Sequence, residues 1–494
     1  MLLEEPIKEA KTVRNYIGGE WVEPRGKPVD VVNPATGRTI ATVGNSTRED
    51  LDDAVKAARA AFPEWRRTTA MARSRILFRF KELLEQNFEE LSRIQTMEHG
   101  KCIDESRGET RRGIENVEVA CGTPMLMQGY HSQDIASGID EWVIPSPLGV
   151  FGIIGPFNFP FMIPLWSAPY AVATGNCVVI KPSSEVPLSQ MRLAELAEEA
   201  GFPPGVWNTV NGGRLVVDGM LDHRDISGIT FVGSTPVGRD VIYKRCGETG
   251  KRVIAQCGAK NCLVVMPDAN VGATIQACQT SFFGNTGQRC LAAANLIVVG
   301  EDGFYKNFMA TMIERVRQMK VGYGLDESIQ MGPLRDRAKK ERVSGYIDVG
   351  VKEGARLSLD GRLVKIIGAY PETAFLGPTI FEDVEPSMTI AQEEIFGPVM
   401  SVLRAGTLDE AIEICNSSPY GNGHSIFTSS GPYARHFQNN VDSGNVGVNI
   451  GIVAPMALFP FGGMKDSFFG VLHTQGREAL RFFTESKVAI QRWF

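Results

Sequence analysis

An alternation of short apolar strands with helices is the feature that most restricts how this chain of 494 residues can fold. The runs 150–154 (VFGII), 177–180 (CVVI) and 226–232 (ISGITFV) are expected strands, and the intervening stretches, such as 188–200, have helical character. Continuous apolar strands joined by helices are typical of a parallel sheet covered on both faces. The pattern predicts a doubly wound α/β sheet, with ligands bound where strands end and helices begin.

A second alternation starts near residue 252 and continues to about residue 450, so we expect a second α/β domain. The length agrees, because single cores stop growing at about 250–300 residues. Residues 135–150 (IASGIDEWVIPSPLGV) have a strand-and-turn pattern outside the helical set, which predicts an arm or hairpin.

Composition excludes several classes of function. A net charge of -6 gives no basic surface for nucleic acid, and no apolar run is long enough to span a membrane. The acidic first residues carry no targeting pattern. The nine cysteines are scattered without a CxxC pair, which argues against a disulfide framework or a zinc site and for a reducing compartment. We therefore expect a cytoplasmic protein with small-molecule partners and no bound metal.

The stretch 281–294 (SFFGNTGQRCLAAA) is the strongest candidate for chemistry. It places Cys290 after a flexible turn and beside the permanent cation Arg289. A neighbouring positive charge favours the thiolate, which is the nucleophilic form of cysteine. A buried structural cysteine is the alternative. The small residues after Cys290 are expected to be helical.

Three loops at expected strand ends carry groups suited to a ligand. Asn158 offers an amide donor for an oxyanion, and Lys181 would suit ribose hydroxyls. The loop 233–238 (GSTPVG) opens a helix, and its glycines would let the backbone approach a phosphate, although it lacks the GxGxxG spacing. A turn asparagine, a surface lysine and a plain glycine turn are the alternatives.

Seven motifs in order along the chain make a specific resemblance. The sequence resembles the aldehyde dehydrogenase superfamily over essentially its full length. The motifs are GPFNFP (155–160), IKPS (180–183), FVGSTPVG (231–238), CGAKN (257–261), GQRC (287–290), QEEIFGPV (392–399) and PFGGMK (460–465).

This resemblance implies a mechanism and a cofactor site. Cys290 would attack the aldehyde carbonyl, the Asn158 amide and the Cys290 backbone N–H would hold the oxyanion of the thiohemiacetal, and hydride transfer to the nicotinamide would leave a thioacyl enzyme. Lys181 and Glu394 resemble the family's ribose contacts and Ser234 its pyrophosphate contact. The implied cofactor-binding residues are Gly155, Phe157, Lys181, Ser184, Glu185, Gly233, Ser234, Gly238, Gln256, Glu394 and Phe396.

One departure from the family pattern bears on the reaction. The hydrolytic members carry a glutamate that activates water against the thioacyl enzyme, and the matching position here is Gln256. An amide cannot accept a proton at neutral pH, and the loss of a general base typically costs about 10²–10⁴-fold in rate. Deacylation is therefore expected to be slow or to use a thiol as the nucleophile.

Within the superfamily, the chain most resembles the CoA-acylating methylmalonate-semialdehyde dehydrogenases. The matching segments are 112–121 (RGIENVEVAC), 257–270 (CGAKNCLVVMPDAN) and 284–294 (GNTGQRCLAAA). The resemblance implies that Arg289 and Arg112 grip a substrate carboxylate, for which guanidinium forks are suited, and that Phe461 lines the aldehyde pocket. Arg107 and Arg111 are close alternatives to Arg112. The implied products are acetyl-CoA or propionyl-CoA, with carbon dioxide lost before CoA attacks.

A second departure concerns the cofactor. The family's Lys-Pro-Ser-Glu reads Lys181-Pro-Ser-Ser184 here, with the glutamate one place later at Glu185. A carboxylate at the position of Ser184 would repel a 2′-phosphate, and a serine does not. We expect NAD as the cofactor, with NADP accepted within about tenfold, a difference of roughly 1.4 kcal/mol.

The resemblance also implies an architecture. Residues 1–129 and 149–256 would form a Rossmann-like NAD(P)-binding domain and 257–450 a catalytic domain. Residues 130–148 and 475–494 would form a small β arm that joins subunits into dimers or tetramers. Two other functions stay open: a dehydrogenase that hydrolyses its thioester with another carboxylate as base, and a non-enzymatic protein that kept the fold. Retention of the nucleophile, oxyanion donor and ribose contacts together speaks against the last.

Overall fold

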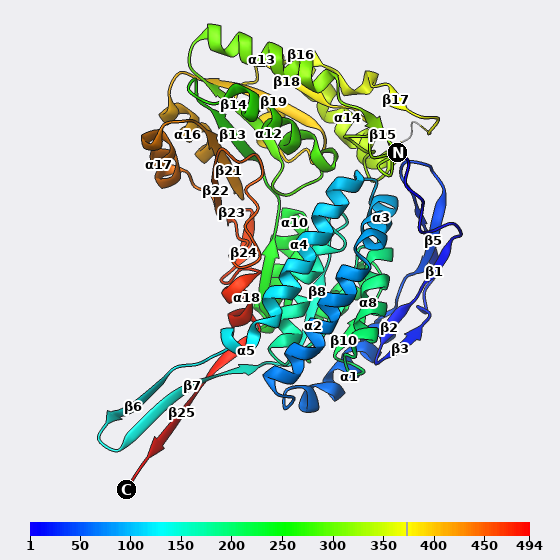
Figure 1. Ribbon diagram of the computed structural model, residues 1–494, viewed down its shortest axis with the longest axis vertical. Helices are drawn as coiled ribbons and strands as arrows, with labels where there is room; N and C mark the ends of the chain where they lie inside the picture. The colour runs from blue at the N-terminus through cyan, green and yellow to red at the C-terminus, as the bar shows by residue number, and fades with distance from the viewer. Residues whose placement is uncertain (372–373) are drawn as a thin grey trace.

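Two parallel α/β sheets and a protruding β arm make up the structure, a computed structural model that describes residues 1–371 and 374–494 (Figure 1). The doubly wound parallel sheet expected from the sequence is confirmed: strands β8 to β12 are all parallel to one another. The eight-stranded sheet has the order β24-β12-β11-β8-β9-β10-β2-β3. Antiparallel strands occur only at its two edges among the described residues.

Helices from the first half of the chain pack around the first sheet. Its strands are β2 (Asn15–Ile17), β3 (Glu20–Val22), β8 (Val150–Ile154), β9 (Cys177–Lys181), β10 (Trp207–Thr209), β11 (Ile226–Val232), β12 (Arg252–Gln256) and β24 (Phe468–Gly470). The helices that accompany it are α1 (Arg48–Trp65), α2 (Ala70–Gln86), α3 (Phe88–His99), α4 (Ile103–Cys121), α5 (Thr123–Leu126), α6 (Met162–Leu165), α7 (Ala168–Ala173), α8 (Leu188–Ala200) and α9 (Arg214–Asp222). Every residue of β8 and β9 is buried, as expected for strands covered on both faces.

The second sheet has seven strands in the order β16-β18-β19-β14-β13-β21-β22. They are β13 (Asn261–Val265), β14 (Ala293–Val299), β16 (Arg356–Leu359), β18 (Thr379–Glu382), β19 (Val399–Ala405), β21 (Gly423–Phe427) and β22 (Asn445–Val448). Its helices are α12 (Val271–Phe283), α13 (Asp302–Arg317), α14 (Arg337–Lys352), α15 (Thr389–Gln392), α16 (Leu408–Ser417) and α17 (Gly431–Asn440). Short two-stranded pairs join β15 (Val321–Gly322) to β17 (Ile366–Ile367) and β20 (Tyr420–Gly421) to β23 (Met464–Lys465).

Two local expectations differ from the structure. The small residues after Cys290 are not helical: Ala293 begins β14, which pairs with β13 and β19, so sheet hydrogen bonds override the helix propensity of alanine. The helix expected to open at the loop 233–238 is present but is not α-helical throughout: α10 (Thr235–Val237) continues as a π-helical turn (Gly238–Tyr243) and then as α11 (Lys244–Thr249).

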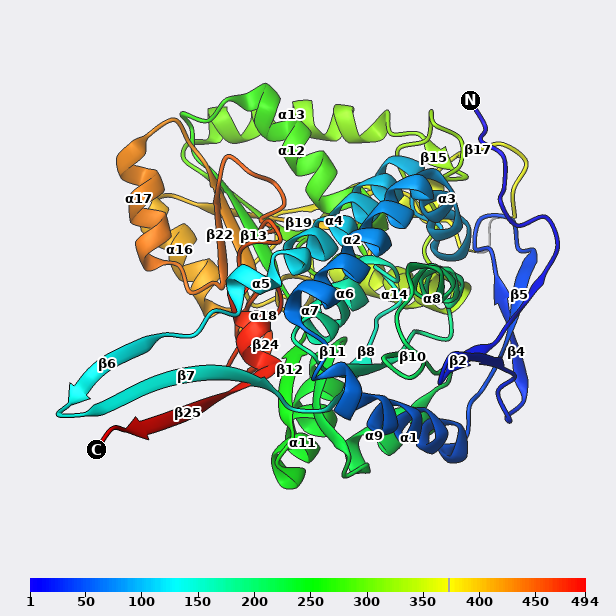
Figure 2. The same ribbon diagram turned by 60° about the horizontal axis from the view of Figure 1, so that its bottom comes forward.

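The expected hairpin is an arm that extends away from both sheets (Figure 2). It consists of β6 (His131–Ala136) and β7 (Ile139–Pro147), and β25 (Thr484–Arg492) pairs with β7 over nine residue pairs after α18 (Gly476–Phe482). A separate ribbon of β1 (Lys11–Val13), β4 (Pro28–Val32) and β5 (Thr39–Gly44) lies along the first sheet's side. In the described part of the chain no helix is both long and apolar enough to cross a membrane.

Candidate active site

The turn before Cys290 is a tightly specified piece of backbone. Asn285 and Thr286 adopt positive φ angles of 54° and 53° in the 3₁₀ turn Gly284–Gly287. A Cβ at Gly287 would lie 2.1 Å from the carbonyl oxygen of Gly397, so only glycine fits there. The turn therefore brings the nucleophile loop against the segment that contains Glu394 and Phe396.

Two asparagine amides hold the carbonyl oxygen of Cys290 itself. Asn261 Nδ2 donates to it at 2.8 Å and also to Ala292 O at 2.8 Å, and Asn422 Nδ2 donates to it at 3.0 Å. Asn261 Oδ1 in turn accepts the N–H of Gly423. The nucleophile loop is thus fixed to the ends of two strands of the second sheet, β13 and β21.

Asn158 comes from the first sheet and meets the same loop. Its Nδ2 donates to Gln288 O at 3.0 Å, two residues before Cys290, and the side chain is buried. The backbone oxygen of Asn158 accepts a hydrogen bond from Lys101 Nζ at 2.6 Å. Lys101 is fully buried and paired with the fully buried Glu109 at 2.6 Å. A buried ion pair therefore supports the proposed oxyanion donor.

Two opposing effects act on the Cys290 thiol. Burial raises its pKa to about 11, while the charge of Arg289 acts in the opposite direction and favours the thiolate, as the sequence led us to expect. Desolvation is the larger of the two effects. The resting group at neutral pH is the thiol, which must lose its proton before it attacks an aldehyde.

The wall beside Cys290 is apolar. Phe159, Ile163, Trp166, Leu291 and Phe461 form one buried cluster against which Cys290 packs. The rings of Trp166 and Phe461 lie 4.4 Å apart between centroids. The structure thus brings Phe461, the residue expected to line the aldehyde pocket, to the nucleophile.

Arg289 is an uncommitted cation beside this wall. Across residues 1–371 and 374–494, its guanidinium makes no ion pair and no hydrogen bond, and it lies 5.6 Å from the Phe159 ring centroid. A partly buried guanidinium without a carboxylate is suited to receive one from a ligand.

The three arginines of α4 are placed differently from one another. Arg107 and Arg111 are bound by glutamates of the neighbouring helices α3 and α2. Arg112 contacts Met456 Sδ, in the loop after β22, at 2.6 Å and pairs with Glu115 at 3.1 Å. Of the three, Arg112 is the one that reaches toward the loop near the apolar wall.

The residues implied for the nicotinamide side lie together. A cavity of about 20 Å³ is lined by Cys290, Glu394, Phe396 and their neighbours. Glu394 Oε1 accepts the N–H of Ala259 at 2.9 Å, and burial raises the pKa of this carboxyl group. Phe396 and Phe157 meet edge to face with centroids 6.0 Å apart.

Of the residues implied to bind the cofactor, Lys181 is fixed at the end of the first sheet, whereas Glu185 is directed elsewhere. Lys181 Nζ is bound to two backbone carbonyls in the loops after β9 and β10, at 2.6 and 3.1 Å, and burial lowers its pKa to about 8. Gly155 closes this end of the sheet by donating its N–H to Lys181 O at 2.9 Å. Glu185 turns away to an ion pair with Lys339 at 2.8 Å. Ser184 is partly exposed in the same loop.

In the loop 233–238, close packing as well as ligand binding accounts for glycine at positions 233 and 238. A Cβ at Gly238 would lie 2.2 Å from Cys257 Sγ, and a Cβ at Gly233 would lie 2.4 Å from the Phe231 ring. Both glycines are therefore needed by this chain's own contacts. Ser234 begins the helical segment and makes no capping hydrogen bond, so its hydroxyl and the helix N-terminus fit a phosphate.

Gln256 lies at the end of β12, and its side-chain amide is hydrogen-bonded to the segment 461–474. Its Nε2 donates to Phe461 O at 2.6 Å and to Thr474 Oγ1 at 3.1 Å. The side chain is buried, and its Oε1 has no hydrogen-bond partner among the described residues. Gln256 therefore ties the sheet to the loop that carries the aldehyde-pocket wall.

Sequence reasoning missed the residues that hold the two loops. Asn261 lies in the quoted motif CGAKN, but no role was assigned to it. Asn422 and Lys101 carried no signal, because each acts on a residue far away in the sequence.

The sequence matches the aldehyde dehydrogenase family model over residues 21–489, and the chain belongs to this family. It is 47% identical over 484 residues to malonate-semialdehyde dehydrogenase 2 of Geobacillus kaustophilus, covering 98% of this chain and 99% of the relative. It is also 47% identical over 491 residues to malonate-semialdehyde dehydrogenase 2 of Bacillus anthracis, covering 99% of each.

Solved structures agree. The methylmalonate-semialdehyde dehydrogenase of Oceanimonas doudoroffii superposes with a TM-score of 0.96 at 42% identity, covering 98% of both chains. A structure from Sinorhizobium meliloti, described as a putative methylmalonate-semialdehyde dehydrogenase complexed with NAD, gives a TM-score of 0.96 at 38% identity over 98% of this chain and 99% of that one.

Proposed function

We propose that this chain oxidises malonate semialdehyde or its methyl homologue, releases the carboxylate as carbon dioxide and transfers the remaining acetyl or propionyl group to CoA. The observation that carries the proposal is Gln256. The general base of hydrolytic relatives is replaced by an amide whose Nε2 is bound to Phe461 O and Thr474 Oγ1. Thiolysis of a thioester needs less help from a base than hydrolysis, because a thiol is the stronger nucleophile near neutral pH.

The remaining residues have definite tasks in this proposal. Cys290 Sγ attacks the aldehyde carbon, and its thiol proton leaves as the S–C bond forms. The Asn158 amide and the Cys290 N–H stabilise the oxyanion, and the unpaired Arg289 holds the substrate carboxylate with Arg112 at the rim. Bound NAD would supply the acceptor for the hydride that leaves the aldehyde-derived carbon. Supporting this assignment are the malonate- and methylmalonate-semialdehyde dehydrogenases among the relatives.

A single kinetic experiment tests the proposal: NADH formation from malonate semialdehyde, with and without CoA, resolved into burst and steady state. We expect a burst of about one equivalent per chain in both cases, because acylation needs no CoA. Sustained turnover is expected only with CoA. Turnover that continues equally without CoA would overturn the acylating reaction, and absence of any burst would overturn the substrate.

Hydrolysis is the second candidate, and one observation favours it. The Glu394 carboxyl group lies in the same small cavity as Cys290, and burial raises its pKa, as suits a general base. If Glu394 activates water, turnover without CoA would exist and would fall about 10²–10⁴-fold in Glu394→Gln.

For the cofactor, we propose that NADP is accepted alongside NAD. Ser184 presents no carboxylate, and Glu185 is drawn into an ion pair with Lys339, which also pairs with Asp336. NADP should support turnover within about tenfold of NAD. Ser184→Glu should lower kcat/KM for NADP by at least about tenfold and leave NAD nearly unchanged, because only NADP brings a second charge to the carboxylate. No turnover at all of the native enzyme with NADP would contradict this.

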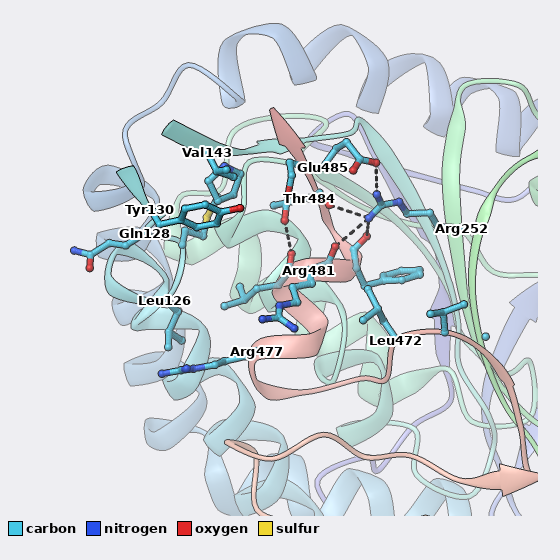
Figure 3. A pocket seen from close by; sticks show the side chains of 18 of the residues that line it. Leu126, Gln128, Tyr130, Val143, Arg252, Leu472, Arg477, Arg481, Thr484 and Glu485 are labelled. Atoms are coloured by element: carbon cyan, nitrogen blue, oxygen red, sulfur yellow. Dashed lines mark hydrogen bonds and ion pairs between the residues drawn. The ribbon is translucent and has the colours of Figure 1, made fainter. Parts of the chain in front are cut away.

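We also propose a homo-oligomer, dimer or tetramer, joined through the arm. Val488, Ile490 and Trp493 on the arm are each more than half exposed. A cavity of about 1120 Å³ lies at the arm's base, where Arg252 is bound to three carbonyls of the 481–484 segment and to Glu485 (Figure 3). Exposed apolar groups of this kind are typical of an interface. Ile490→Glu should reduce the molar mass measured by light scattering; an unchanged mass would contradict the arm's role.

The domain division stays a proposal too, with residues 1–129 and 149–256 binding the nucleotide and 257–450 carrying the nucleophile. We further propose that the protein works in the cytoplasm, for which its nine free cysteines are support.

A further inference from the structure

Three potential metal ligands converge behind the second sheet, away from the apolar wall of the active site. Cys262 lies on β13, His424 on β21 and Cys415 on α16. One ligating atom of each lies within 4.8 Å of the other two. All three side chains are buried, with exposed fractions of 1%, 1% and 0%.

The sheet register explains why these groups meet. Leu263 pairs with Ser425 across the two parallel strands, so the residues one place earlier, Cys262 and His424, are neighbours on the opposite face. Cys262 belongs to the apolar layer that α16 covers, whereas Leu263 belongs to the layer on the other side. Cys415 closes the group from the helix.

The His424 ring has an unexplained polar atom. Its Nδ1 accepts the N–H of Cys262 at 2.9 Å, which leaves the ring proton on Nε2. This Nε2 is buried and has no hydrogen-bond partner among the described residues. An unpaired polar atom in an apolar layer destabilises the fold, so a ring in this place points to a ligand-binding role.

We propose that Cys262, Cys415 and His424 form a buried site for a thiophilic divalent cation of the Zn²⁺ and Cd²⁺ type. Two thiolates and a neutral imidazole are ligands that such ions prefer. Their two negative charges cancel the charge of the ion, so the complex is neutral and suits the apolar residues around it.

Binding has a defined balance. Two metal–sulfur bonds and one metal–nitrogen bond form, and the two thiol protons leave to solvent. The imidazole stays neutral. If Nδ1 binds, its lone pair is no longer available to the Cys262 N–H; if Nε2 binds, Nδ1 takes up the ring proton. In either case the hydrogen bond between Cys262 N and His424 Nδ1 must break.

This consequence connects the site to catalysis. Asn261, the residue before Cys262, holds the carbonyl oxygen of Cys290, and Gly423, the residue before His424, donates to Asn261 Oδ1. A cation that pulls the two strands into a new arrangement acts on the support of the nucleophile. Its effect reaches Cys290 without contact with substrate.

Cadmium binding to the intact chain tests the proposal. Cys290→Ala is used as the background, because the nucleophilic thiol could itself bind the probe. Titration with Cd²⁺ alone should saturate at one ion per chain with sulfur-to-cadmium charge-transfer absorption in the ultraviolet. The same addition should raise the thermal midpoint, because the ion binds the folded state.

Ligand variants separate this site from other thiols. In the Cys290→Ala background, Cys415→Ser and His424→Asn should each weaken Cd²⁺ binding at least about tenfold, or 1.4 kcal/mol. The matched control is Cys278→Ala, which removes an equally buried thiol on the opposite face of the sheet. The second ligand variant serves if the first fails to fold. Absence of charge-transfer absorption, or equal affinity in the ligand variants and the control, would overturn the proposal.

Discussion

The loops that carry Asn158 and Cys290 are held in the same way but by donors of different charge. In each loop, side chains from other segments donate hydrogen bonds to the backbone carbonyl of the named residue. For Asn158 the shorter hydrogen bond, 2.6 Å, comes from the ammonium of Lys101, which is fully buried and paired with Glu109; the Asn285 amide adds one at 3.3 Å. For Cys290 the donors are the neutral amides of Asn261 and Asn422.

The two kinds of donor differ in how much stability the protein would lose if the donor were removed. Breaking a buried ion pair leaves one charge without a partner, which costs about 3–5 kcal/mol. Removing a neutral donor leaves only an unsatisfied carbonyl, which costs about 1–3 kcal/mol. The position of Asn158 therefore depends mainly on a buried charged group, and its loss would be costly. The position of Cys290 depends on two neutral donors, and the loss of either would cost less.

The largest effect is expected for Lys101→Met, which should lower the free energy of unfolding by about 3–5 kcal/mol, because the carboxylate of Glu109 is left buried and unpaired. Denaturant unfolding measures it. The double variant Lys101→Met, Glu109→Gln should recover most of the loss, since no charge is then stranded and the amide oxygen can still accept the N–H groups of Phe161 and Met162 that Glu109 binds. A double variant as unstable as the single one would show that packing, not charge, dominates this support.

Next in size is Asn158→Ala, which should lower kcat about 10²–10³-fold, or about 2.7–4 kcal/mol in activation free energy, through loss of the oxyanion donor. Its thermal midpoint should fall only slightly, because Gln288 O, which loses the Asn158 amide, keeps its hydrogen bond from Asn285 Nδ2 at 2.9 Å, and the carbonyl held by Lys101 is unchanged. A burst of normal rate in stopped-flow measurements would contradict the assignment of Asn158.

The neutral support should respond in two steps. Asn261→Ala removes donors to two carbonyls and the acceptor of Gly423, whereas Asn422→Ala removes one donor to Cys290 O. We expect unfolding free energies lower by about 2–3 and about 1 kcal/mol respectively. If chemical denaturation gave equal losses of unfolding free energy for the two variants, the extra hydrogen bonds of Asn261 would not contribute as the contacts indicate.

The smallest perturbation is pH, which changes no residue. Burial raises the pKa of Cys290 to about 11, so the thiolate fraction, and with it the rate of alkylation by iodoacetamide, should rise about tenfold per pH unit between about pH 7 and 10. Arg289→Gln should slow alkylation at every pH, because the guanidinium favours the thiolate. A rate that is flat above neutral pH would show that the thiol has already ionised.

Much of this molecule could be read from local pattern. Apolar runs predicted β8, β9 and β11, and the turn before Cys290 and the motif residues pointed to the catalytic loop. The helix expected after Cys290 failed because alanine's local preference is weak beside the pairing of β14 with two strands. The raised pKa of Cys290 was not foreseen, because the burial that causes it is not visible in a sequence.

By itself the sequence determined the class of fold, and it predicted the nucleophile, the oxyanion donor and the replacement of a general base by Gln256, since each is a matter of residue type at a place in a local pattern. Only the tertiary structure decided which groups support them. Lys101 acts on a residue 57 positions away, and Asn422 on one 132 positions away. Cys262 and His424 likewise meet through strand register. Such contacts depend on how strands are ordered and which face is covered, and no spacing along the chain encodes that directly.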